Sequence, residues 1–154
     1  MSILHIVKYP DELLHEKSKD IKYFDKKLEN LVLNMFETMY KFDGIGLAAV
    51  QIGILKNVIV IDIDKDGQQF KSEVINPKII SFSQDISEMN EGCLSVRKKT
   101  FNIKRPNKII VEFFKLDGKQ YKIEADGLLS KCFQHEIDHT NGITIVDRYN
   151  EQKD

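Results

Sequence analysis

Two histidines and a glutamate towards the end of the chain have the spacing of a metal site. His135, Glu136 and His139 form the pattern H-E-x-x-H. Each residue of an α-helix advances by about 100°, so the two imidazoles lie about 40° apart around the axis and one turn apart along it. They can therefore bind one cation. Glu136, about 60° from His139, can reach a water on that cation without binding the cation itself.

The surrounding residues predict a mostly internal helix between Asp126 and Asn141. The apolar arc that continues from the two histidines consists of Leu128, Leu129, Cys132, Phe133 and Ile137. The polar side chains occupy the remaining third of the helix: Ser130, Lys131, Gln134 and Asp138. A chance pattern on a solvated helix is the alternative, but two buried imidazoles without partners would be costly, and a metal satisfies both.

Two histidines and a water leave the cation one protein ligand short. The residues alone offer four candidates: Glu91, Cys93, Cys132 and Asp147. Cys132 lies one turn before His135 but at the neighbouring level, which favours a role in the core. Cys93 lies in a short glycine-containing segment between strands, where a thiolate can be presented and the following N–H left free. On this evidence the choice stays open.

A second stretch that could do chemistry runs over residues 43–53. It holds three glycines and two alanines in eleven residues, so the backbone can approach a ligand closely. A phosphate loop is a weak interpretation, because the third glycine and the strand-to-helix context are missing. We expect a loop that lines a substrate, with Gln51 as the polar group that binds or polarises a carbonyl.

The rest of the sequence predicts the elements that must position these residues. Asp25 caps a long N-terminal amphipathic helix, whose apolar face is Leu28, Leu31, Val32, Met35, Phe36 and Met39. Strands are predicted over residues 58–63, 70–75, 78–83, 107–116 and 119–125, with turns at 66–67, 76–77 and 117–118. Asp126 caps the metal helix, and Asn141-Gly142 closes it. The predicted fold is α+β, with mainly antiparallel β-sheets wrapped around the central metal-binding helix.

Composition narrows the classes of function. A chain of 154 residues fits one domain, residues 1–154, with room for a sizeable core. The 23 basic and 24 acidic residues give a net charge of −1, which implies no bulk attraction to DNA or to a membrane. The first residues lack the basic and apolar regions of a signal peptide, and two cysteines suit a reducing compartment. We expect a cytoplasmic monomer.

Three segments together resemble the motifs of the peptide deformylases. They are residues 44–51 (GIGLAAVQ), 91–95 (EGCLS) and 134–139 (QHEIDH), in the family's order and roughly its spacing. Residues 10–11, 75–77 and 125–129 also resemble family positions, so the similarity covers nearly the whole chain. Three motifs that occur together are far more specific than any one of them.

The resemblance implies a complete metal site. Cys93, His135 and His139 would hold one divalent ion, with water as the fourth ligand. Deformylases use Fe²⁺ natively and accept Zn²⁺, Ni²⁺ or Co²⁺, and this donor set suits several of them. The implied reaction removes the N-formyl group from the N-terminal formyl-methionine of newly made polypeptides and releases formate. N-formyl-methionyl peptides are thus the implied partners, and the ribosome near its exit tunnel is a further expected partner.

The resemblance also implies roles around the metal. The cation would lower the pKa of its water, and Glu136 would take the proton and pass it to the leaving amine. The Gln51 amide and the Leu94 backbone N–H would stabilise the oxyanion. The implied substrate-binding residues are Ile45, Gly46, Met89, Glu91, Leu128 and Cys132. Arg105 resembles a family arginine that we expect to pair with Asp138 behind the ligands.

The sequence departs from the family pattern at several positions. Arg97 replaces a usual proline, Lys131 an aliphatic residue near the methionine pocket, and Thr140 a common leucine. The sequence also ends at Asp154, where many bacterial members continue into a C-terminal helix. We expect the stem of Lys131 to cover apolar surface while its amine reaches solvent, so that substrate preference changes and the chemistry stays intact.

Two rival functions fit the same pattern. An H-E-x-x-H metallopeptidase would use the same metal and glutamate, but its third ligand is usually Glu or His. A non-catalytic, metal-stabilised module that docks on ribosomes would need neither Glu136 nor Gln51. An assay with formylated and plain peptides separates these functions.

Overall fold

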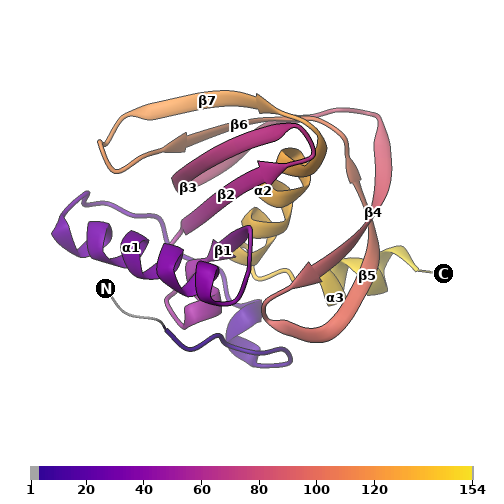
Figure 1. Cartoon of the computed structure of the whole chain (residues 1–154), viewed down its shortest axis with the longest axis horizontal. Coiled ribbons are helices and arrows are strands. Elements are labelled where there is room, and N and C mark those ends of the chain that lie inside the picture. Colours follow the sequence, from indigo (N-terminus) through magenta and orange to yellow (C-terminus); the bar gives the residue numbers. More distant parts are fainter. Residues whose placement is uncertain (1–3, 154) are drawn as a thin grey trace.

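The larger of the two sheets has five strands. The computed structural model describes residues 4–153 (Figure 1). In spatial order the strands are β1 (Gly46–Ala48), β2 (Val58–Lys65), β3 (Gln68–Phe82), β6 (Ile109–Phe114) and β7 (Gln120–Ala125). All neighbouring strands are antiparallel. The predicted turns at 66–67 and 117–118 join β2 to β3 and β6 to β7, and their glycines have positive φ.

A second, separate sheet consists of two long strands. They are β4 (Ile86–Cys93) and β5 (Val96–Pro106), which pair antiparallel. Three α-helices occur among residues 4–153: α1 (Lys26–Lys41), α2 (Gly127–Thr140) and α3 (Ile145–Gln152). Short 3-10 helices, η1 (Glu12–His15) and η2 (Ala49–Ile52), complete the fold. The fold is α+β with antiparallel sheets, as predicted.

Helices cover both faces of the five-stranded sheet, which explains the uninterrupted apolar run in β2. Ile59, Ile61 and Ile63 belong to the core that includes Phe133 of α2. Val58 and Val60 point the other way and belong to the core formed with α1. Helix α2 also contacts β5, so it touches both sheets, and Figure 1 shows it at the centre of the molecule.

The predicted helix caps are present, with one difference in detail. The Asp25 carboxylate accepts a hydrogen bond from the Leu28 N–H at 3.0 Å and caps α1. Asp126 occupies the N-cap position of α2, but its side chain makes no capping bond and accepts one from Gln68 instead. Asn141 ends α2, followed by Gly142 at positive φ.

The prediction of two strands over 70–75 and 78–83 is wrong, because Asn76-Pro77 does not end the strand. β3 continues through it, with a φ of 51° at Asn76 and a register shift against β6 between Ile75 and Lys78. Such a register shift is typical of a β-bulge, which bends a strand without ending it. The Asn76 side chain is held by the backbone of Ile21, at 2.8 and 2.9 Å.

Helix α2 is buried on its polar side as well as on its apolar side. Ser130, Gln134 and Asp138 are all buried. The prediction that the Lys131 amine reaches solvent is wrong. Only 4% of Lys131 is exposed, and its Nζ donates hydrogen bonds to the carbonyls of Ser87 and Arg105 at 2.9 and 2.8 Å.

Strands β4 and β5 and helix α3 have no counterpart among the predicted elements. Cys93 is the last residue of β4, whereas the sequence predicts that it lies in a short segment between strands. Among residues 4–153, no helix combines the length and the apolar character needed to cross a membrane.

Candidate active site

Cys93, His135 and His139 are brought together by the end of β4 and one face of α2. Their candidate ligand atoms all lie within 4.8 Å of one another. Cys93 Sγ lies 3.3 Å from His139 Nε2, and the two imidazole centroids are 5.1 Å apart. The helical spacing of the histidines thus places them as predicted. A register shift between Glu91 and Cys93 marks an irregularity in the β4–β5 pair, a feature that can re-aim a side chain.

The donor atoms of this cluster suit a divalent cation. The Nδ1 atom of His135 lies 3.0 Å from a Glu91 carboxylate oxygen, which leaves Nε2 available as a ligand. His139 Nδ1 and Glu136 Oε1 are buried and have no hydrogen-bond partner among the described residues. One thiolate and two imidazoles form a site that zinc or ferrous iron can occupy.

The other candidates for the third ligand are placed elsewhere. Both carboxylate oxygens of Glu91 are bonded to Arg105, and one also to His135. The Asp147 carboxylate caps α3 through Thr144. Cys132 is not part of the cluster, and burial together with nearby carboxylates raises the pKa of its thiol well above the ordinary value.

The electrostatics favour a thiolate at Cys93 and a proton acceptor at Glu136. Burial alone would raise the pKa of Cys93, but the charges of His139 and His135 and their hydrogen bonds hold it well below its usual value. Burial raises the pKa of Glu136, and the two histidines only partly offset this effect. A carboxyl group whose pKa is shifted towards neutrality is suited to accept and return a proton.

Gln51 lies at the same site and is fixed at both ends of its amide. Its oxygen accepts a hydrogen bond from the Ala48 N–H at 2.9 Å. Its nitrogen lies 3.1 Å from Ser95 Oγ and 3.5 Å from Cys93 Sγ. The amide N–H groups are therefore directed to the region beside Cys93 and Leu94.

The N-terminal segment holds both Gln51 and the turn after Cys93, and no sequence pattern predicts this contact. The Val7 N–H donates to the Gln51 carbonyl at 2.7 Å, and the Tyr9 N–H donates to the Ser95 carbonyl at 2.8 Å. Between them, Lys8 Nζ donates to the Leu94 carbonyl at 3.0 Å. Since these residues are far apart in sequence, no local pattern could indicate the contact.

A cavity of about 620 Å³ opens onto this cluster. The predicted site residues that line it are Ile45, Gly46, Gln51, Met89, Glu91, Cys93, Leu94, Leu128, Cys132, His135 and Glu136. His139 lies behind this lining, beside Cys93. Gly46 lies so close to α2 that a methyl group there would be 2.7 Å from Glu136 Oε2 and 2.9 Å from Cys132 Sγ.

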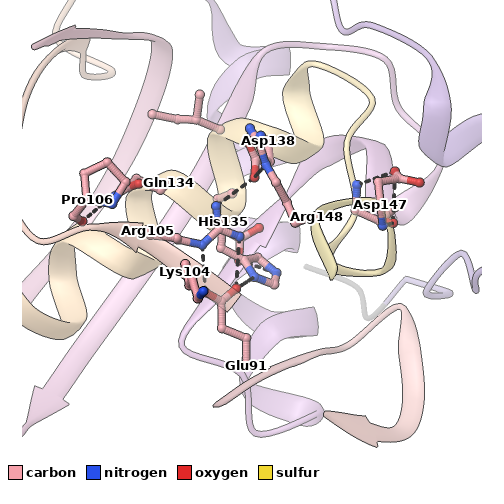
Figure 2. A network of polar contacts seen from close by, with 12 residues as sticks. Glu91, Lys104, Arg105, Pro106, Gln134, His135, Asp138, Asp147 and Arg148 are labelled. Carbon is pink, nitrogen blue, oxygen red and sulfur yellow. Dashed lines mark hydrogen bonds and ion pairs between the residues drawn. The ribbon is translucent and has the colours of Figure 1, made fainter. Parts of the chain in front are cut away.

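A network of charged side chains extends from His135 through Glu91 to helix α3 (Figure 2). Arg105 contacts Glu91 at 2.7 and 3.0 Å and Asp138 at 2.8 Å, so the predicted pairing of Arg105 with Asp138 is confirmed. Arg148 of α3 contacts both oxygens of Asp138, at 2.8 and 2.9 Å. Sequence reasoning missed Arg148, because it did not predict the helix that carries it.

Comparisons with known proteins agree with this arrangement. The family model for polypeptide deformylase matches residues 3–154. The chain is 43% identical to a peptide deformylase of Agrobacterium fabrum (strain C58), covering 99% of this chain and 91% of that protein. It is 44% identical to a peptide deformylase of Thermodesulfovibrio yellowstonii, covering 96% and 90%.

Solved structures are similar over nearly the same length of the chain. A peptide deformylase of Ehrlichia chaffeensis in complex with actinonin has a TM-score of 0.93 and 39% identity, covering 96% of this chain and 89% of that one. The Met-Ala-Ser-bound class I type b enzyme of Acinetobacter baumannii has a TM-score of 0.92 and 28% identity, covering 96% and 98%. By this similarity over nearly its whole length, the chain belongs to the polypeptide deformylase family.

Proposed function

We propose that the chain is a single catalytic domain that hydrolyses the N-formyl group of formyl-methionyl peptides and releases formate. The observation that carries this proposal is the convergence of Cys93, His135, His139, Glu136 and Gln51 on one cavity. Because newly made polypeptides carry this group, we further propose that the protein acts in the cytoplasm near the exit tunnel of the ribosome. We also propose that it acts as a monomer.

Cys93, His135 and His139 would hold one divalent cation, with Fe²⁺ as the proposed native metal and Zn²⁺, Ni²⁺ or Co²⁺ as substitutes. When bound, the cation supplies Lewis acidity, which polarises a carbonyl and lowers the pKa of water. Glu91 holds His135 Nδ1, so it sets which nitrogen of the ring faces the cation. We therefore propose a positioning role for Glu91 in place of the substrate-binding role predicted from the sequence.

Glu136 would move the proton. Its Oε1 atom is buried and has no hydrogen-bond partner among residues 4–153, and burial raises the pKa of the carboxyl group, so it can take a proton from the attacking water. The same carboxyl group can then give the proton to the nitrogen that leaves when the formyl C–N bond breaks. The transfer regenerates the carboxylate and yields a free α-amino group.

Gln51 and Leu94 would stabilise the negative charge that develops on the formyl oxygen. The Gln51 amide is held beside Cys93, and the Lys8 and Tyr9 contacts fix the turn that contains Leu94. Donors that are already oriented need no reorganisation during the reaction, and removing one typically costs about 10²–10³ in rate.

The substrate would bind along β1 and in the apolar part of the cavity. β1 is an edge strand of its sheet, and Ile45 and Gly46 line the cavity, so a peptide backbone can pass close to them. Ile45, Met89, Leu128 and Cys132 would contact the methionine side chain. The similar Acinetobacter structure contains Met-Ala-Ser, a peptide of this kind.

Anaerobically purified protein loaded with Fe²⁺ tests the proposal. Formyl-Met-Ala-Ser should release formate, and unformylated Met-Ala-Ser should stay intact. Cleavage of peptide bonds in the plain peptide would instead support a metallopeptidase. Bound metal with no turnover of either peptide would support a non-catalytic module.

A further inference from the structure

Four side chains of alternating charge link the C-terminal helix to His135. Arg148, Asp138, Arg105 and Glu91 follow one another outward to inward, and Glu91 bonds His135 Nδ1 at 3.0 Å (Figure 2). The elements that supply them are α3, α2, β5 and β4. The outer end of the network borders a second cavity, of about 580 Å³, which is lined by Arg148, Asp138 and Arg105. This cavity lies on the side of α2 away from the first cavity, which Glu136 lines.

The inner members of this network have little contact with solvent that could replace a lost partner. Arg105, Glu91 and Asp138 are 4%, 7% and 8% exposed. The two arginines and two carboxylates balance each other, and among residues 4–153 Arg148 is the only charged partner of Asp138 Oδ1. Without Arg148, Arg105 alone would face two buried carboxylates. Breaking a buried ionic pair in this way leaves an uncompensated negative charge. The side chains of the remaining members must then shift so that Arg105 can compensate both carboxylates.

We propose that Arg148 is a positioning residue for the metal ligand His135. Its bidentate contact holds Asp138, Asp138 holds Arg105, and Arg105 holds the Glu91 carboxylate that orients the imidazole. Planar guanidinium groups suit such a chain because they fix the direction as well as the charge of each contact. The inference rests on the proposed metal site, and it extends the support of that site to α3, beyond the motifs.

Three variants separate positioning from charge and from simple docking of α3. Arg148→Met removes both the charge and the bidentate contact. Arg148→Lys keeps the charge but not the planar fork. Lys153→Met removes a charge from the same end of the chain, where Lys153 lies over the Tyr149 ring and outside the network.

The measurement is Co²⁺ binding to metal-free protein, followed by the absorption of the bound ion, together with thermal unfolding of the metal-free forms. Substitution of groups that orient metal ligands typically weakens metal binding about 10–100-fold, and we expect about tenfold for Arg148→Met, at the outer end of the network. Arg148→Lys should lie between this variant and the wild type. Lys153→Met should bind Co²⁺ within about twofold of the wild type, since an exposed charge has little effect.

A changed absorption spectrum in Arg148→Met would report an altered ligand arrangement, which a purely structural role of α3 would not produce. Wild-type affinity and spectrum in Arg148→Met would overturn the inference, whatever its thermal stability, and so would an equal loss in Lys153→Met. Because metal binding is measured without substrate, these outcomes do not depend on formate release. A failure of the proposed hydrolysis would therefore be recognised separately.

Discussion

Lys131 of helix α2 holds two elements of the fold together through a buried charge. Its ammonium group is buried and bonds the carbonyls of Ser87 and Arg105, which are cross-strand partners in the β4–β5 ribbon. It therefore ties the ribbon to α2. Lys131 lines the cavity, as expected for a residue near the proposed methionine pocket. The direction of its amine depends on strands that the sequence pattern does not reveal.

Lys131→Ile tests the effect of this residue on substrate preference. We expect KM for formyl-methionyl peptides to change while kcat barely moves, because Lys131 lines the cavity and contacts none of the proposed catalytic groups. Steady-state kinetics of formate release measure both constants. An unchanged KM would contradict the prediction.

Burial of Lys131 also predicts a pH dependence of stability. Desolvation lowers the pKa of Lys131 below its ordinary value of 10.5, and the nearby Glu91 only partly offsets this effect. The unfolded chain therefore binds this proton more tightly than the folded protein. The wild type should gain stability relative to Lys131→Met as the pH rises from the lowered pKa towards 10.5. Urea unfolding of both proteins between pH 7 and about 10.5 measures the difference, and a constant difference would refute the prediction.

At the scale of elements, the close packing of β1 against α2 sets the position of Glu136. Gly46 leaves no room for a side chain, as the glycine-rich sequence suggested for a segment that approaches another group closely. The sequence could not show that the close neighbour is Glu136 itself. That contact arises from the packing of a helix against a strand about ninety residues earlier.

Gly46→Ala should displace the Glu136 carboxylate and lower kcat about 10²-fold, since a shift of about 1 Å in a catalytic group can cost that much. Gly92→Ala is the matched control, because its methyl group would meet only Thr100 Cγ2, at an ordinary 3.6 Å. Formate release by the two variants, with their metal content, checks the prediction. Equal kcat values would contradict it.

Elements with strong local patterns could be predicted, and elements held by distant contacts could not. Helix α2 carries its own apolar arc and a C-terminal Asn141-Gly142 stop, and β2 carries its own β-branched run. β4 (ISEMNEGC) is mostly polar and exposed, so it lacks the apolar alternation that marks a strand. The sequence predicts a turn at Asn76 where the strand continues, because the contacts that stabilise this conformation come from the distant Ile21.

At the scale of the whole molecule, the candidate metal ligands connect the two sheets through α2. Cys93 belongs to the β4–β5 ribbon, whereas His135 and His139 belong to the helix that packs on the five-stranded sheet. A cation held by all three would therefore connect parts of the fold that are distant in sequence. The motifs predicted the three ligands, but their supports in the N-terminal segment and α3 emerge only from the folded chain.

Metal binding should stabilise the protein measurably. A ligand that binds only the folded state adds about 2.7 kcal/mol to the free energy of unfolding at 100 times its Kd. Thermal unfolding of metal-free protein should shift upwards when Zn²⁺ is added, and Cys93→Ser should lose most of that shift. The same shift in Cys93→Ser would show that Zn²⁺ binds elsewhere.

The most direct test of the central claim compares wild type with Glu136→Ala and Glu136→Gln, each loaded with Fe²⁺ without oxygen. Formate release from formyl-Met-Ala-Ser and bound iron are measured on the same samples. General acid–base groups typically contribute about 10²–10⁴-fold to the rate. Turnover should therefore fall at least about 10²-fold in both variants, while one iron per chain stays bound. Turnover near the wild-type rate in an iron-loaded variant would contradict the assignment of Glu136 as the group that moves the proton.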